Sequence, residues 1–213
     1  PRELRTMHAW VVGDRSRKQT KNGETKSSKA PINPRTGQAA KSNDPTTWGT
    51  FDEAIDHATK DTRAFGVGVN LLGSEFVGLD LDNVIDHETG NLLPAAADLI
   101  NQLPGTYTER SPSGTGLRLF YTGTKPKALR GCTIKNAFGP DADLEVYDGE
   151  GGGRYLTVTG NAWPNKALPI KSLTDQDLST LVELQERCRT GADTSASPPP
   201  QYDGHRDDID RAE

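Results

Sequence analysis

The sequence predicts a protein of the α+β class, with short strands and a few helices around a modest core. Two observations indicate this: short apolar runs recur along the chain, and helix-start signals stand between them. The apolar content is low, 32% of 213 residues, and 22 Gly and 14 Pro indicate many turns and exposed loops. The length suits one large domain or two small lobes that share a core.

The first part of the chain predicts a strand, a loop and a helix. His8–Val12 is a short apolar run and predicts a strand. Residues 13–30 are rich in Lys, Ser and Gly, which indicates a mobile loop, and a turn follows within Pro31–Gly37. Thr50 and Glu53 have the spacing of a capping box, so a helix is expected to follow Thr50.

The remainder of the chain predicts further strands and two more helices. Ala64–Leu72 and Glu75–Leu81 predict two strands joined by a tight turn at Gly73-Ser74, as in a β-hairpin. A proline in the first turn predicts a helix over Pro94–Leu103, and Thr174 is expected to cap a helix that ends near Arg189. The other expected strands are Thr106–Arg110, Leu117–Tyr121, Leu144–Tyr147 and Tyr155–Thr159.

Composition divides the chain into a folded core, residues 1–189, and a linker, residues 190–213. After Thr190 the sequence turns to Gly, Ser and three consecutive prolines, a composition typical of linkers. The charged segment His205–Glu213 is expected to lead toward another module.

Cysteine usage and hydropathy limit the cellular setting. Cys132 and Cys188 lie far apart, and no CxxC pair or Cys/His cluster is present, so no structural zinc site is expected. A reducing, cytoplasmic compartment fits this pattern. The alternative is a single disulfide between the two cysteines. No apolar run approaches the roughly 20 residues that span a bilayer, so no membrane association is expected.

Charge is distributed unevenly along the chain. Residues 1–41 hold ten Lys or Arg and three acids, a net charge of +7, whereas the whole chain carries −5 and the remainder therefore −12. This basic segment is either a solvated loop or an arm that binds nucleic-acid phosphates. The candidate phosphate contacts in it are Arg15, Arg17, Lys18, Lys21 and Lys29.

The strongest local motif is the acidic strand Val77–Asp82. Side chains alternate along a strand, so Asp80 and Asp82 share a face. Gly78 lies on the same face and leaves room for something to approach. Adjacent carboxylates repel each other unless a cation neutralises them, and hard oxygen ligands select Mg²⁺ or Mn²⁺. The alternative is a strand end that leads into an acidic turn.

A second acidic strand follows at residues 143–148. Alternation puts Asp143, Glu145 and Tyr147 on one face, with Leu144 and Val146 in the core. An unpaired carboxylate among hydrophobic neighbours is costly, and a role as third metal ligand would explain Glu145. The alternative is an edge strand with one wet face.

Two glycine-rich segments beside arginines suit phosphate binding. In the first, Ser113, Gly114 and Gly116 let backbone N–H groups approach an anion, and Arg118 on the next strand can reach a phosphate. In the second, a glycine run precedes Arg154, which would hold a triphosphate or pair with a surface acid. The alternative for the first is a plain hairpin turn. Three carboxylates together with two arginines match two-metal phosphoryl transfer.

In this order the segments resemble the primase–polymerase domains of the archaeo-eukaryotic primase superfamily, found in phages, plasmids and mobile elements. The resemblance implies a two-lobe catalytic core with mixed sheets, one lobe similar to an RNA-recognition-motif sheet, and an active site in the cleft. It runs from about Trp10 to Gly160, and the segments that carry it are Lys29–Pro34, Asn43–Phe51, the Asp80/Asp82 pair, Tyr107–Gly114, Leu144–Tyr147 and Gly153–Gly160.

The resemblance implies template-directed nucleotidyl transfer on single-stranded DNA, in the replication of a phage or mobile element. Two Mg²⁺ or Mn²⁺ ions would be bound by Asp80, Asp82 and Glu145, with nucleoside or deoxynucleoside triphosphates as substrates. The family's middle motif usually ends in a histidine that contacts the triphosphate, and here Arg118 stands in that position. Arginine keeps the positive charge but cannot donate a proton at neutral pH. By analogy, a fused or associated helicase is expected beyond the linker.

Two other functions stay open on the sequence. A metal-dependent nuclease also uses paired carboxylates, although the arginines and the glycine turn are surplus for a hydrolase. A non-catalytic DNA-binding initiator domain is the third possibility, and carboxylates that face phosphate argue against it. Tyr147 and Tyr155 are candidates for sensing the sugar of a nucleotide, or else core residues.

Overall fold

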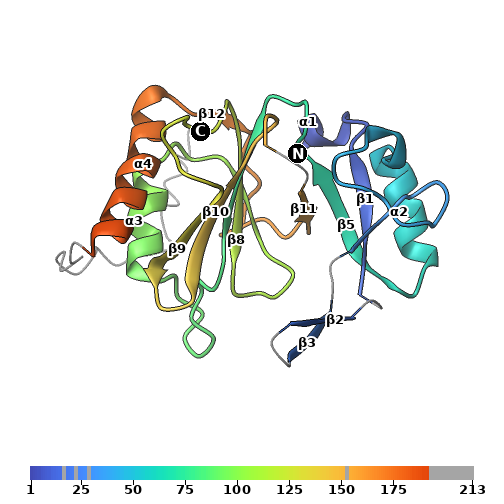
Figure 1. The fold of residues 1–213 in the computed structure, drawn as a ribbon, viewed down its shortest axis with the longest axis horizontal. Helices are drawn as coiled ribbons and strands as arrows, with labels where there is room; N and C mark the ends of the chain where they lie inside the picture. Colours follow the sequence, from blue (N-terminus) through green and yellow to red (C-terminus); the bar gives the residue numbers. More distant parts are fainter. Residues whose placement is uncertain (16–17, 22–23, 28–29, 152–153, 192–213) are drawn as a thin grey trace, which may run out of the picture.

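The computed structural model describes residues 1–15, 18–21, 24–27, 30–151 and 154–191. Two β-sheets lie between helices, and Figure 1 shows α3 (Pro94–Gln102) and α4 (Asp175–Thr190) beside one sheet and α2 (Phe51–Lys60) beside the other. Buried apolar residues form two clusters, one for each sheet with its helices. This architecture confirms the predicted α+β class.

The first sheet is antiparallel throughout and forms the core of the first lobe. α2 covers it, and the short α1 (Arg2–Arg5) packs nearby through the buried Leu4. α2 begins where the sequence predicts: Thr50 Oγ1 accepts from the Glu53 amide at 3.2 Å, and the Glu53 carboxylate accepts from the Thr50 amide at 2.8 Å. The strand order is β11 (Tyr155–Val158), β5 (Ala64–Asn70), β1 (Trp10–Asp14) and β4 (Ala30–Ile32).

The second sheet is mixed, because its edge strand β12 runs parallel to β8 while the other pairs are antiparallel. α3 and α4 pack on one of its faces. Its strands in spatial order are β9 (Thr133–Gly139), β10 (Ala142–Tyr147), β6 (Phe76–Leu81), β8 (Leu117–Thr122) and, both against β8, β7 (Tyr107–Arg110) and β12 (Lys171–Ser172).

A split β-α-β unit organises the second sheet. The chain leaves β6, passes through α3 and returns as β7, and β8 lies between these two strands. This order agrees with the expected RNA-recognition-motif-like lobe. On the face away from α3 and α4, the side chains of Phe76, Tyr107 and Phe120 join the core of the first lobe. The two lobes are therefore packed together through this face.

One expectation about strand pairing differs from the structure. β5 and β6 are strands, but the hairpin expected at Gly73-Ser74 was wrong, because β5 belongs to the first sheet and β6 to the second. The turn there is held by Ser74, whose amide and hydroxyl donate to Leu71 O at 2.9 and 2.6 Å, and by the Gly73 amide, which donates to Gly149 O at 2.9 Å. These contacts redirect the chain from one sheet to the other.

The expected loop over residues 13–30 contains secondary structure. β2 (Lys18–Lys21) and β3 (Glu24–Ser27) pair as a two-stranded antiparallel ribbon, with Lys18 opposite Ser27 and Lys21 opposite Glu24. Figure 1 shows this ribbon apart from both larger sheets. The polar composition of the segment hid these strands, because neither has an apolar face to bury.

The remaining expectations concern the ends of the chain and its cysteines. Thr174 caps α4 as predicted, in a capping box with Asp177. Of the linker expected over residues 190–213, Thr190 ends α4 and Gly191 caps it, and residues 192–213 lie outside the described residues. Cys132 and Cys188 are free thiols in the structure. Among the described helices, none combines the length and the apolar character that crossing a bilayer requires.

Candidate active site

Four charged residues lie side by side across the second sheet. Strand register places Glu145 of β10 opposite Asp80 of β6, Asp80 opposite Arg118 of β8, and Arg118 opposite Glu109 of β7. Directly opposed residues in antiparallel strands point to the same face. These four side chains therefore form one row, on the face that is turned toward the first lobe.

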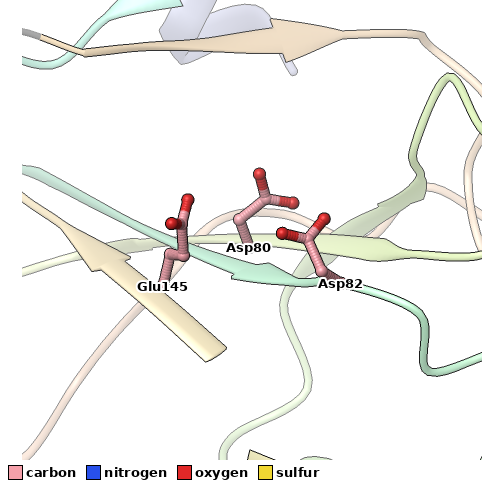
Figure 2. A group of neighbouring side chains, drawn as sticks. All are labelled: Asp80, Asp82 and Glu145. Atoms are coloured by element: carbon pink, nitrogen blue, oxygen red, sulfur yellow. The ribbon is translucent and has the colours of Figure 1, made fainter. Parts of the chain in front are cut away.

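The acidic residues predicted as metal ligands come together on this face. Carboxylate oxygens of Asp80, Asp82 and Glu145 lie within 4.8 Å of one another, and Figure 2 shows the three side chains pointing to the same space. Asp80 is buried and the other two are partly exposed. Three carboxylates this close repel one another unless positive charge lies among them, and oxygen donors are the ligands that Mg²⁺ and Mn²⁺ prefer. The donor set fits a divalent metal.

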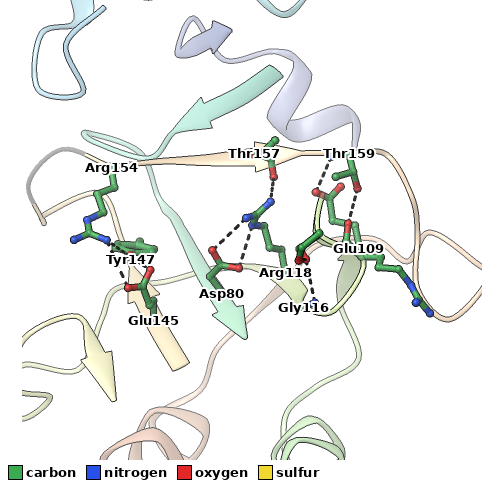
Figure 3. A network of polar contacts seen from close by, with 12 residues as sticks. Asp80, Glu109, Gly116, Arg118, Glu145, Tyr147, Arg154, Thr157 and Thr159 are labelled. Carbon is green, nitrogen blue, oxygen red and sulfur yellow. Dashed lines mark hydrogen bonds and ion pairs between the residues drawn. The ribbon is translucent and has the colours of Figure 1, made fainter. Parts of the chain in front are cut away.

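Arg118 supplies positive charge to this group from inside the protein. Its Nε and Nη2 donate to the two carboxylate oxygens of Asp80 at 3.1 and 3.3 Å, and its Nη1 donates to Thr157 O at 2.9 Å (Figure 3). Only 3% of Arg118 is exposed. The guanidinium thus compensates the charge of Asp80 and also ties β8 of the second sheet to β11 of the first.

The other end of the charged row carries a second arginine. The Tyr147 hydroxyl donates to Glu145, and Arg154 Nη1 donates to the Tyr147 hydroxyl at 3.0 Å and lies 3.5 Å from Glu145 Oε1 (Figure 3). Burial, followed by the hydrogen bond to Glu145, raises the pKa of Tyr147, so this phenol stays protonated as a donor. The neutral Tyr147 hydroxyl therefore orients the Glu145 carboxylate, and the half-exposed guanidinium of Arg154 lies beside it.

Asp143 is separated from this cluster although it lies on the same strand. Its carboxylate pairs with Lys135 and accepts from the Asn136 amide at 2.9 Å. A register irregularity between Ala142 and Leu144 interrupts the ladder at this point. The strand thus has two acids with different partners, and only Glu145 joins Asp80 and Asp82.

A cavity of about 300 Å³ is lined by two of the three carboxylates, Asp80 and Glu145. Residues of both lobes contribute to its walls, so it lies where the two lobes meet. Three larger hollows, of about 700, 740 and 410 Å³, are lined by no member of the acidic cluster. We assign the smaller cavity as the candidate active site because charged groups converge on it, although it is not the largest. The charged and phenolic side chains in the wall of the smaller cavity are Asp80, Arg118, Glu145, Tyr147, Arg154 and Tyr155.

Gly78 has a different role from the one its sequence context suggests. A Cβ built on Gly78 would lie 2.1 Å from Cδ1 of Leu156 and 3.3 Å from Cδ1 of Leu71. The space beside Asp80 is filled by the side chain of Leu156 from β11 and is not open to a ligand. The glycine therefore allows the first sheet to pack closely against the strand that carries the carboxylates.

The predicted phosphate-binding turn lies beside the C-terminal end of β6. Ser113, Gly114 and Gly116 belong to the connection between β7 and β8, and a Cβ on Gly116 would meet Leu81 O at 2.6 Å. The Ser113 hydroxyl lies 2.9 Å from the Ser111 hydroxyl and 3.0 Å from the Thr115 hydroxyl. The turn is thus next to the residue that precedes Asp82, but it does not line the 300 Å³ cavity.

The structure describes only some of the residues predicted to contact DNA. Arg15 is exposed, and its backbone amide donates to Arg63 O at 3.0 Å at the end of β1. The backbones of Lys18 and Lys21 lie at the two ends of β2. The side chains of Lys18 and Lys21, and the whole of Arg17 and Lys29, lie outside the described residues.

Sequence reasoning missed two buried polar residues beside the site. Glu109 is fully buried and accepts three hydrogen bonds, and Asn70 is fully buried where β5 meets the start of β11. With its amide suitably oriented, Asn70 donates to Arg154 O at 3.1 Å and to Ser42 O at 3.0 Å. A polar side chain inside a predicted strand was the available signal, but only the paired aspartates had a pattern that pointed to chemistry.

A carboxylate triad with two arginines between two lobes defines a protein of the phosphoryl-transfer class that works with divalent cations. Comparison with known families narrows this class. The family model for the N-terminal domain of bifunctional DNA primase/polymerases matches residues 10–176, and the chain belongs to this family. The resemblance drawn from the sequence motifs is therefore confirmed.

One curated relative is similar over most of the chain. It is the DNA primase-polymerase of Nitratiruptor phage NrS-1, 35% identical over 178 residues, which make up 83% of this chain. The matched region is 22% of that protein, so the chain spans about a fifth of its relative's length.

Proposed function

We propose that this chain is the catalytic core of a DNA primase–polymerase that joins nucleotides on a single-stranded DNA template. The observation that carries the proposal is the row Glu145–Asp80–Arg118, in which two carboxylates and a guanidinium from adjacent strands share one face beside Asp82. A nuclease would need the carboxylates alone. Two arginines on the same cavity suit a substrate with several phosphates.

Asp80, Asp82 and Glu145 are proposed to hold two divalent cations, Mg²⁺ or Mn²⁺. Such ions, when bound, would lower the pKa of an attacking 3′-hydroxyl and neutralise the leaving pyrophosphate. The protein's own contribution is to hold the carboxylates together. Arg118 offsets the charge of the buried Asp80, and the Tyr147 hydroxyl fixes the carboxylate of Glu145.

Arg118 and Arg154 are proposed to bind the triphosphate of a nucleoside or deoxynucleoside triphosphate, with Ser113, Gly114 and Gly116 as a further phosphate contact. Arg154 is half exposed and reaches the cavity from the position just before β11, so it can turn toward a ligand at little cost. Arg118 uses its Nε and one N–H on each Nη in the contacts described above, which leaves a second N–H on Nη1 and on Nη2. These can face an anion without loss of the pair with Asp80.

The template is proposed to be held by the basic segment that contains Arg15, Arg17, Lys18, Lys21 and Lys29. An overall charge of −5 is compatible with DNA binding, because only a local basic surface has to meet the phosphates. A cytoplasmic setting and a fused or associated helicase complete the proposal. The linker composition and the greater length of the relative support a further module, and its assignment as a helicase rests on analogy.

Incubation with unprimed single-stranded DNA, labelled nucleotides and Mn²⁺ tests the function. We expect labelled oligomers whose sequence is complementary to the template. Shortening of the template without synthesis would point to the nuclease. DNA binding without synthesis or cleavage would point to a non-catalytic initiator domain, and a parallel binding assay distinguishes this outcome from inactive protein.

A further inference from the structure

β11 is the strand that closes the acidic site from the side of the first lobe. Arg154 and Tyr155, at its start, line the cavity, and Leu156 fills the notch left by Gly78. The carbonyl of Thr157 accepts from Arg118. Any shift of β11 along its own direction would therefore move Arg154 relative to the carboxylates and disturb the hydrogen bond that orients the Arg118 guanidinium.

Glu109 holds the far end of this strand. Its carboxylate accepts from the Thr159 amide at 2.8 Å and from the Gly160 amide at 3.1 Å, immediately after β11 ends, and Figure 3 shows it beside Thr159. A third hydrogen bond comes from the Tyr107 hydroxyl at 2.8 Å. The contact crosses between lobes, because Glu109 belongs to β7 of the second sheet and β11 to the first.

Glu109 is also the next residue in the charged row after Arg118. The two are directly opposite in the β7–β8 ladder, so Arg118 lies between Asp80 on one side and Glu109 on the other. Glu109 is 0% exposed and does not line the cavity, so it is not placed to touch a substrate. A fully buried carboxylate is costly unless its position is needed or well satisfied by hydrogen bonds.

We propose that Glu109 is a positioning residue of the nucleotide site, which fixes β11 through Thr159 and Gly160 and thereby holds Arg118 and Arg154 at their working distance from the carboxylates. This inference rests on the proposed triphosphate contacts of the two arginines. It assigns a role to a residue that neither binds metal nor meets the nucleotide.

The test is the E109Q variant, in which the amide keeps the size of the side chain but has one acceptor oxygen for the two backbone N–H groups. We expect the KM for nucleotide to rise about tenfold or more, the effect of one lost charge-assisted hydrogen bond. The kcat should stay within about threefold, and the Mn²⁺ affinity of the nucleotide-free protein, measured by calorimetry, should not change. Asp80, Asp82 and Glu145 are all retained in this variant.

D177N is the matched control. Asp177 is also a buried carboxylate that accepts a backbone N–H, from Thr174 at 2.7 Å, but it belongs to the capping box of α4, on the opposite side of the second sheet. The same chemical change there should leave the nucleotide KM as it is. A comparable rise in D177N would mean that the effect of E109Q is a general loss of stability.

An unchanged nucleotide KM in E109Q, or a fall in kcat alone, would overturn the proposal. If E109Q does not fold, E109D carries the same test, because its shorter carboxylate keeps the charge but cannot reach both amides. Failure of both variants to fold would make Glu109 a purely structural residue and would also overturn it. Nucleotide affinity is measured by direct binding as well, so a wild type that binds nucleotide without synthesis would contradict only the proposed function.

Discussion

Arg118 and Asp80 face each other directly across β8 and β6 and are joined by two hydrogen bonds, of 3.1 and 3.3 Å. Both residues are buried. The pair makes a proposed nucleotide-binding residue and a proposed metal ligand parts of one unit. Removal of either partner takes this ion pair away from a buried charge, which is far more costly than the loss of an exposed ion pair.

We therefore expect Arg118→Ala to lower the free energy of unfolding by about 3–5 kcal/mol, the usual cost of breaking a buried ion pair. Urea denaturation measures this. Mn²⁺ should restore more stability to the variant than to the wild type, because a cation at Asp80 replaces the lost positive charge. A loss below about 1 kcal/mol, or no difference in the response to Mn²⁺, would separate Arg118 from the metal site.

Gly78→Ala should destabilise the protein by about 1–3 kcal/mol through overpacking against Leu156. The companion variant Leu156→Ala removes the Cδ1 that a new Cβ would meet. In that background the alanine at position 78 should be close to neutral, and a double-mutant cycle from urea denaturation measures the coupling. Additive effects of the two changes would show that the contact between the sheets does not depend on Gly78.

Glu109 predicts a pH dependence of stability. Burial raises the pKa of its carboxyl above the ordinary glutamate range, so the folded state binds the proton more tightly than the unfolded state. Its contribution to stability is complete below the unfolded pKa of about 4.3 and is lost as the pH rises through the raised folded pKa. Relative to the wild type, Glu109→Gln should therefore gain stability as the pH rises from about 4 to 8. Unfolding curves in which the difference is flat, or runs the other way, would contradict the shift.

The basic segment predicts a salt dependence of template binding. Neutralising Arg15, Arg17, Lys18 and Lys21 together should weaken binding to single-stranded DNA. Each lost phosphate contact should also reduce the slope of log affinity against log salt by about 0.7. Fluorescence anisotropy at several salt concentrations measures the slope. An unchanged slope would make the segment a bystander.

The parts of the site that follow from local periodicity could be predicted from the sequence. Asp80 and Asp82 share a face because strand side chains alternate, and the caps of α2 and α4 are encoded within four residues. The order of the short motifs then indicated the family, and with it the role of Glu145 as the third carboxylate. Each of these inferences needs only neighbouring residues or a known pattern.

The parts that depend on which strands become neighbours could not be predicted. The Gly73-Ser74 turn favours a hairpin, but Leu71 and Gly149 hold it as a crossing between sheets. The pairing of Arg118 with Asp80 arises only because β8 lies between β6 and β7. Glu109 is a polar residue inside a predicted strand, but its role could not be predicted, because its backbone partners Thr159 and Gly160 are about fifty residues further along the chain.

The central claim is that Asp80, Asp82 and Glu145 form one catalytic centre for nucleotide addition. Glu145→Gln and Asp143→Asn test it most directly, because they make the same kind of change on one strand, and only Glu145 lies within the cluster. In a strand-synthesis assay with Mn²⁺ on single-stranded DNA, we predict that Glu145→Gln loses about 100-fold or more of the rate, while Asp143→Asn stays within a few-fold of the wild type. Synthesis by Glu145→Gln at the wild-type rate would contradict the account.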